Sequence, residues 1–342
     1  MIKYTQLKST NRQNLMDVLP LKKPFTVLIE PSSKCNFKCI QCFQSIRKPS
    51  YFTRNRMNMP LDRFQRVIDQ LKSWPGGKLK VLKLSMYGEP LINPDFCEML
   101  RIAKDADVAE RIETTTNASL LARPIAEKMV QRQLDYARIS IYASDQEKHK
   151  TITGSGTGIR VIHENLRILQ EVKNQRSSEK PFVSCKMLDA YGPENDRFVK
   201  MYQDVADEVF IDKPHGWIKV DGVDFIRNYY QDGVCDALGD VEQNSTPRIA
   251  CPMAFTTMAV RSNGDVSPCC VDYIGGTNLG NMEQHGMLEI WHSERWFEFQ
   301  KMQLENRKQE NCSCARCDIY RNDHYTRDTI DGFPVERLRE KA

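Results

Sequence analysis

FTVLIEPSSKCNFKCIQC, residues 25–42, joins a short apolar segment to three closely spaced cysteines. The segment is mainly β-branched, aromatic and aliphatic, which is typical of a buried strand, and Pro31 ends it. Cys35, Cys39 and Cys42 then follow as CxxxCxxC on the loop after that strand. Structural zinc usually takes four protein ligands, often in CxxC pairs, so zinc would need a remote fourth ligand here. A cubane iron–sulfur cluster fits better than zinc or three plain core cysteines, because three thiolates leave one iron open to a substrate or cofactor.

Six apolar segments alternate with five amphipathic ones after this start. Strands are predicted at residues 25–30, 81–86, 111–116, 137–142, 182–188 and 208–212. Helices are predicted at residues 61–73, 94–106, 124–133, 158–173 and 194–205. Consecutive βαβ units of this kind predict an α/β fold with a parallel sheet, either doubly wound or an open barrel. In both, chemistry collects at the carboxyl ends of the strands, where the cysteine loop lies.

Composition sets the class of protein. The 342 residues are 40% hydrophobic and 27% charged, with a formal net charge of +4, so bulk charge predicts neither nucleic-acid nor membrane binding. No long apolar run and no signal-peptide pattern is present, which predicts a cytoplasmic protein. Because that compartment keeps thiols reduced, most of the twelve cysteines are expected to be metal ligands rather than disulfides.

A second set of cysteines lies near the carboxyl end. Seventeen residues separate Cys251 from Cys269, and they include a predicted hairpin. Cys314 and Cys317 form a CxxC after a predicted helix at residues 288–304. Four thiolates brought together in this way are enough to close either an iron–sulfur cluster or a zinc site.

CxxxCxxC after the first strand resembles the signature of the radical S-adenosylmethionine (radical SAM) enzymes. The resemblance implies a partial (β/α)6 barrel over residues 25–214, with Cys35, Cys39 and Cys42 as ligands of a [4Fe-4S] cluster. In that family the open iron is chelated by SAM. Cleavage of SAM then gives a 5′-deoxyadenosyl radical that abstracts hydrogen from the substrate.

Two further segments resemble cofactor-binding motifs of the family. Gly88-Glu89-Pro90 matches its GEP turn, which engages the SAM amino group, and Thr115-Thr116-Asn117 resembles its TNG segment, with Ala118 in place of glycine. The residue before the third cysteine, which usually touches adenine, is Gln41 rather than an apolar residue. The resemblance therefore implies that Phe43 or Phe37 supplies that contact.

Strand alternation adds candidates of its own. Ser140 and Tyr142 should share the face that points into the barrel, as should Lys186, whereas Cys185 should point away. Ser140 is a candidate for binding a ribose hydroxyl and Lys186 for the SAM carboxylate, since a buried ammonium needs an anionic partner. Either could instead be a satisfied polar residue of the barrel interior. Cys185 and Cys97 are expected to be core thiols.

The carboxyl-terminal cysteines resemble the SPASM/twitch extension of radical SAM enzymes. Because no cysteine follows position 317, the count implies the shorter twitch-like form, a β-hairpin plus helix over residues 251–320. Its single auxiliary [4Fe-4S] cluster would have the ligands Cys251, Cys269, Cys314 and Cys317. Cys270 and Cys312 are left over. The remaining segments are interpreted as a leader (1–24), a linker or substrate-covering segment (215–250) and a tail (321–342).

The resemblance implies an oxidoreductase that acts on a small polar metabolite, a sugar or aminocyclitol-like alcohol, with the auxiliary cluster taking the second electron. Six basic and no acidic residues between Lys34 and Arg56 suit an acidic electron donor, a flavodoxin or ferredoxin. A peptide maturase is an alternative, although the short leader leaves no room for a peptide-recognition domain. An epimerase would need a thiol to return hydrogen, with Cys235 as the catalytic candidate, and a zinc-binding scaffold or adaptor is the alternative of a different class.

Overall fold

The computed structural model describes residues 13–45, 56–214, 225–230, 247–272, 275–321 and 329–341. Nine strands form one sheet in the order β6-β5-β4-β3-β2-β1-β7-β8-β9. The strands are β1 (Thr26–Ile29), β2 (Leu79–Leu84), β3 (Ala109–Thr116), β4 (Tyr136–Ser140), β5 (Phe182–Leu188), β6 (Glu208–Asp212), β7 (Thr257–Val260), β8 (Asp265–Ser267) and β9 (Gly280–Asn281). The strands from β6 to β7 are parallel, and the two pairs that involve β8 are antiparallel. Among the described strands β6 and β9 are the edges, so the predicted open α/β barrel is confirmed.

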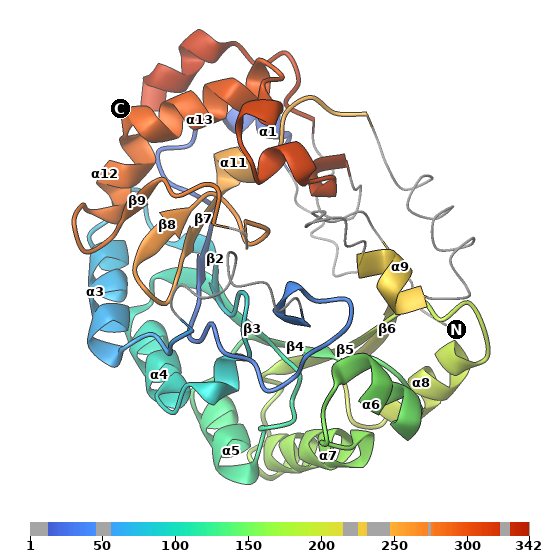
Figure 1. Ribbon diagram of the computed structural model, residues 1–342. Helices are drawn as coiled ribbons and strands as arrows, with labels where there is room; N and C mark the ends of the chain where they lie inside the picture. Colours follow the sequence, from blue (N-terminus) through green and yellow to red (C-terminus); the bar gives the residue numbers. More distant parts are fainter. Residues whose placement is uncertain are drawn as a thin grey trace.

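Helices cover the outside of this curved sheet, as Figure 1 shows. They are α3 (Leu61–Lys72), α4 (Phe96–Ala106), α5 (Arg123–Gln131), α7 (Ile159–Gln175) and α8 (Glu194–Tyr202). Each follows a strand and precedes the next, as the βαβ pattern predicts. The carboxyl ends of the parallel strands therefore lie at one rim of the barrel.

The two faces of the sheet differ in chemistry. The face under the helices carries aliphatic residues without solvent exposure: Val27, Ile29, Leu82, Leu84, Ile139 and Val183. The inner face carries charged residues, because alternate side chains point the other way: Lys83 pairs in register with Glu113, and Thr115 with Arg138. Burial of each aliphatic side chain stabilises the fold by about 1.5–3 kcal/mol, so the outer face holds the barrel together and the inner face is left for function.

The carboxyl-terminal module extends the same sheet. β7 follows α11 (Met253–Thr256) and pairs in parallel with β1, the strand that precedes the cysteine loop. Two buried tryptophans in contact anchor the helices behind it: the Trp291 indole donates to the Leu21 carbonyl at 3.0 Å and that of Trp296 to the Ala254 carbonyl at 3.2 Å. The predicted hairpin is therefore part of the barrel wall, next to its first strand.

Two elements differ from the sequence prediction. The helix predicted at 288–304 is two helices, α12 (Met287–His292) and α13 (Glu294–Leu304), because Ser293 has an extended backbone and its hydroxyl caps α13 by accepting from the Trp296 amide. A further helix, α6 (Gln146–Thr153), was not predicted. Its signals were Asp145, whose carboxylate accepts from the Lys148 amide, and Gly154 in the left-handed conformation at its end.

The remaining described elements are short. They are α1 (Leu15–Val18), α9 (Phe225–Tyr230), η1 (Phe43–Ser45), η2 (Pro90–Ile92), η4 (Lys308–Glu310), η5 (Cys314–Arg316), η6 (Ile319–Arg321) and η7 (Val335–Lys341). None of the helices in the described ranges is long and apolar enough to cross a membrane. Of the proposed covering segment, only residues 225–230 and 247–250 are described.

Candidate metal centres and cofactor site

The three amino-terminal cysteines lie together on the loop after β1. Burial raises the pKa of Cys35 to about 11 and of Cys42 to about 12, and raises that of Cys39 further, with an added contribution from the other two thiols. Without a cation these thiols would stay protonated at neutral pH, because the buried thiolate is not solvated. A metal centre would supply the missing positive charge and release the protons.

Helix α6 holds this loop from one side. The Lys38 amide donates to the Thr153 carbonyl at 2.7 Å and the Ile40 amide to the Ile152 carbonyl at 2.9 Å. Between the cysteines, the buried Phe37 ring packs edge-on against His149, with ring centroids 5.8 Å apart. The unpredicted helix thus fixes the spacing of the first and second cysteines.

The Gly88-Glu89-Pro90 turn holds the loop from the other side. The Glu89 amide donates to the Lys34 carbonyl at 2.8 Å. A Cβ atom on Gly88 would lie 2.3 Å from the Ser32 carbonyl oxygen and 2.4 Å from that of Lys34, so only glycine permits this approach. The structure therefore gives Gly88 a packing role, in addition to any contact with a cofactor.

Glu89 links the turn to the end of β3. Its buried carboxylate accepts from the Thr116 hydroxyl at 2.5 Å and from the Asn117 amide at 2.8 Å. Burial raises the pKa of Glu89 to about 7, although these hydrogen bonds lower it. The Asn117 side chain in turn donates to Asn36 on the cysteine loop at 3.0 Å. The two sequence motifs and the cysteines thus form one hydrogen-bonded unit, in which Thr116 rather than Thr115 meets Glu89.

Ala118 occupies the position where the family pattern has glycine. Its backbone has φ of +55°, in the left-handed region that favours glycine. A non-glycine residue loses about 1–2 kcal/mol in this conformation. Ala118 therefore adopts a backbone conformation that glycine would adopt at a lower cost.

A cavity of about 180 Å³ opens beside Cys42. Ser140, Tyr142 and Lys186 line it, on the face that strand alternation predicts, and Cys185 is buried on the opposite face. Lys186 forms an ion pair with Asp212 at the end of β6, so its charge already has an anionic partner. The cavity brings together the predicted ribose and carboxylate contacts with one of the three thiols.

The residues predicted to contact adenine, Phe43 and Phe37, do not line this cavity. Phe43 packs edge-on against Tyr87, with ring centroids 5.5 Å apart, and is not among the residues that line the cavity. Phe37 is buried under His149 and Tyr142. The apolar wall of the cavity comes instead from Leu188 and from three residues of α9 that were not predicted: Ile226, Tyr229 and Tyr230. Their signal was an adjacent tyrosine pair in the proposed covering segment.

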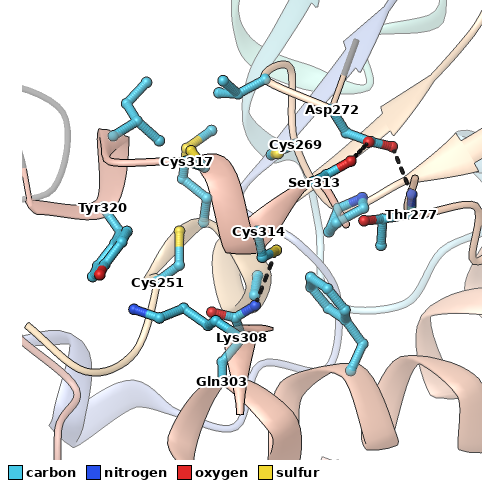
Figure 2. A pocket seen from close by; sticks show the side chains of 16 residues that line it. Cys251, Cys269, Asp272, Thr277, Gln303, Lys308, Ser313, Cys314, Cys317 and Tyr320 are labelled. Atoms are coloured by element: carbon cyan, nitrogen blue, oxygen red, sulfur yellow. Dashed lines mark hydrogen bonds between the residues drawn. The ribbon is translucent and has the colours of Figure 1, made fainter. Parts of the chain in front are cut away.

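The four carboxyl-terminal cysteines line one cavity, shown in Figure 2. Cys251 precedes α11, Cys269 follows β8, and Cys314 and Cys317 bound η5. Burial raises the pKa of all four thiols, that of Cys314 to about 12. No three His, Cys, Asp or Glu side chains in the described ranges are placed to hold a single metal ion. The four thiols instead surround a shared space.

The leftover cysteines lie apart from this lining. Cys312 is exposed, and Cys270 does not line the cavity. Burial raises the pKa of Cys270, and the charge of Lys83 on the inner face of the sheet partly offsets this. Cys97 is half-buried against the core. Cys235, the catalytic candidate for an epimerase, lies outside the described residues.

A network of half-buried and buried side chains joins the two cysteine sets. The Arg261 guanidinium lies over the Tyr87 ring, 5.4 Å from its centroid, and pairs with Asp272 at 2.9 Å. Asp272 lines the four-thiol cavity and accepts from the Ser313 hydroxyl beside Cys314. Since Tyr87 also contacts Phe43, which follows Cys42, side chains in contact run from one cysteine set to the other.

The donor sets fit iron–sulfur clusters. Three thiols without a fourth protein ligand suit a [4Fe-4S] cluster with an open iron, and four thiols suit a closed one. The second cavity also holds a side-chain N–H donor to sulfur, because the Gln303 amide donates to the Cys314 sulfur at 3.3 Å. Cys35, Cys39 and Cys42 would hold the first cluster, and Cys251, Cys269, Cys314 and Cys317 the second.

Similarity to known proteins agrees with these donor sets. The family model of the radical SAM superfamily matches residues 29–204, just over half of the chain, and that of an iron–sulfur cluster-binding domain, SPASM, matches residues 251–318. A tungsten-containing aldehyde ferredoxin oxidoreductase cofactor-modifying protein of Pyrococcus furiosus is 23% identical over 303 residues, 79% of this chain and 82% of that protein.

Two solved structures share the fold at 16% identity. BtrN in complex with AdoMet and 2-DOIA matches with a TM-score of 0.55. The match covers 87% of this chain and 94% of the BtrN chain. Streptococcus suis SuiB bound to the precursor peptide SuiA matches with a TM-score of 0.58. The match covers 90% of this chain and 72% of the SuiB chain. The chain belongs to the radical SAM superfamily, with the SAM-binding [4Fe-4S] cluster and S-adenosylmethionine of that family, and carries a SPASM domain for auxiliary iron–sulfur clusters.

Proposed function

We propose that the protein is an oxidoreductase that removes two hydrogens from a small polar metabolite, a sugar or aminocyclitol-like alcohol. The observation that carries the proposal is the four-thiol cavity. A cluster held by four thiolates has no open iron for a substrate, so it suits electron transfer. When bound, SAM and its cluster supply a hydrogen-atom acceptor, and the auxiliary cluster supplies an acceptor for the remaining electron.

The residues around the first centre orient SAM in this proposal. The Glu89 carboxylate fixes the Gly88-Glu89-Pro90 turn against the end of β3, and the backbone of this turn would receive the SAM amino group. Ser140, which lines the cavity beside Cys42, would bind a ribose hydroxyl, and Thr115 and Asn117, at the carboxyl end of β3, would lie near the cofactor. Lys186, neutralised by Asp212, would meet the SAM carboxylate as one member of a charge pair.

The inner face of the sheet supports a polar substrate. Lys83, Glu113 and Arg138 lie on neighbouring strands there, and Glu113 also pairs with Arg111 at 3.1 Å. Hydroxyl and amino groups of a metabolite can exchange their water hydrogen bonds for such partners, whereas an apolar substrate would leave these charges unsolvated. Exposed Lys34 and Lys38 beside the cysteine loop support docking of an acidic flavodoxin or ferredoxin.

An epimerase is the second candidate. Returning a hydrogen atom needs a thiol, and Cys270 is a described cysteine that neither lines the auxiliary cavity nor reaches solvent fully. Lys83, on the inner face of the sheet, lowers the pKa of the Cys270 thiol, which burial otherwise raises. Cys235 remains the candidate named by the sequence.

Anaerobic turnover with a panel of polyols and amino sugars tests the proposal. An oxidoreductase gives a product lighter by the mass of two hydrogen atoms, with one 5′-deoxyadenosine formed per product. With a deuterium-labelled substrate, the deuterium should appear in the 5′-deoxyadenosine. An epimer whose mass is unchanged in H2O, and which gains one deuterium when the reaction is run in D2O, would instead establish the second candidate. Cys39→Ala is the control, since it removes a ligand of the first cluster and should abolish 5′-deoxyadenosine formation.

A further inference from the structure

Lys308 is a buried lysine in the wall of the four-thiol cavity. It begins η4, only 7% of its surface is exposed, and its ammonium has no hydrogen-bond partner in the described part of the chain. Figure 2 shows its side chain passing Cys251 and ending near Tyr320. A buried ammonium without an anionic partner is costly, so its presence here needs an explanation.

Within the described ranges, neighbouring side chains neutralise the charge of Lys308 only weakly. The ammonium lies 3.1 Å from the centroid of the Tyr320 ring, whose quadrupole attracts a cation by about 0.5–2 kcal/mol. The carboxylate that lines the same cavity, Asp272, is committed to Arg261, Ser313 and the amides of Gly276 and Thr277. Among the described residues, no carboxylate forms an ion pair with Lys308.

The thiols of the cavity offer the missing charge. Four thiolates around a cubane cluster carry a net negative charge that increases on reduction. Lys308 and Gln303, which donates to the Cys314 sulfur, line the same cavity as Cys251 and Cys314. A fixed positive charge and an N–H···S hydrogen bond on the same side both favour the more negative, reduced state.

We propose that Lys308 sets the reduction potential of the auxiliary cluster, raising it so that the cluster accepts an electron from the substrate. This rests on the proposed function, because it assigns the cluster the role of acceptor. The cluster gains one electron, the substrate radical loses one electron and one proton, and Lys308 keeps its charge throughout. Tyr320 holds the ammonium in place, and Gln303 adds a second favourable contact.

Redox titration followed by electron paramagnetic resonance tests the inference without substrate. The full-length protein with Cys35, Cys39 and Cys42 replaced by Ala leaves the second centre as the source of the signal. In this background Lys308→Met and Lys308→Gln should each shift the midpoint potential to more negative values, by about 59 mV or more, which is a tenfold change in the oxidised-to-reduced ratio for one electron. Lys308→Arg, which keeps the charge, should stay close to the parent.

Iron content decides which variants count. If Lys308→Met loses the iron of the auxiliary cluster, Lys308→Gln is the neutral variant that is titrated. Equal midpoints in a neutral variant that retains its iron and in Lys308→Arg would overturn the inference. Its failure is distinct from that of the proposed function: a shifted midpoint with no oxidised product rejects the oxidoreductase, whereas oxidised product with an unmoved midpoint rejects the role of Lys308.

Discussion

At the scale of single residues, neighbouring side chains have separate tasks. Cys269 and Cys270 are adjacent, yet the first lines the four-thiol cavity and the second does not. Similarly, Gly88 packs against carbonyl oxygens of the cysteine loop, while Glu89 accepts hydrogen bonds from the end of β3. These differences make single substitutions informative.

Replacement of each adjacent cysteine should separate their roles. Cys269→Ala removes a thiol from the cavity, so iron should fall from about eight to about four per chain when the second [4Fe-4S] cluster is lost. Cys270→Ala should leave the iron content near about eight. Iron analysis of anaerobically reconstituted protein checks both. Equal iron loss in both variants would show that Cys270 takes part in binding the cluster.

Gly88→Ala should disturb the first centre alone. The added Cβ would lie 2.3 Å from the Ser32 carbonyl oxygen, so the turn or the cysteine loop must move. We expect SAM cleavage to fall at least about tenfold and the free energy of unfolding to decrease by about 1–3 kcal/mol, as overpacking usually costs. Gly156→Ala is the matched control, because a Cβ atom on Gly156 would have no other atom within 4 Å among the described residues. Normal SAM cleavage by Gly88→Ala would show that the close approach is dispensable.

At the scale of elements, the sequence predicted the repeated strand–helix units but missed a short helix and individual side-chain contacts. The βαβ alternation predicted six parallel strands and five helices, since apolar periodicity over long segments reports burial directly. Helix α6 was not predicted because, at eight residues, it is too short to show a clear apolar periodicity. The packing of Phe43 was also missed: it follows the cysteines in sequence, but its ring packs against Tyr87, which no spacing rule reveals.

Helix α6 should therefore control the order of the cysteine loop. Asp145→Ala removes the carboxylate that caps it, a loss of about 0.5–2 kcal/mol. Because the Lys38 and Ile40 amides donate to carbonyls at the end of α6, their hydrogen exchange should become faster. Asn14→Ala removes a comparable cap from α1 and should leave those two amides unchanged. Unchanged exchange in Asp145→Ala would mean that the loop is held without the helix.

At the scale of the whole molecule, both centres belong to one sheet. Parallel pairing of β7 with β1 places the auxiliary module beside the strand that leads to the first three cysteines. Half-buried Arg261 lies between the two cysteine sets, with the Tyr87 ring on one side and buried Asp272 on the other. Removing one partner of such a buried pair leaves an uncompensated charge and is strongly destabilising. One sheet thus carries both candidate metal centres, and no cysteine belongs to both sets.

Because the two cysteine sets share no ligand, we expect that SAM cleavage can be uncoupled from formation of the oxidised product. Replacement of Cys314 and Cys317 together with Ala should lower the iron content to about four per chain. SAM cleavage should persist, because Cys35, Cys39, Cys42 and the Glu89 network are untouched, but the oxidised product should no longer form. Cys312→Ala, an exposed position in the same segment, is the control and should behave as the parent. Oxidised product at the parent rate in the double variant would show that the four-thiol site only stabilises the fold, and loss of SAM cleavage as well would show that the first centre depends on it.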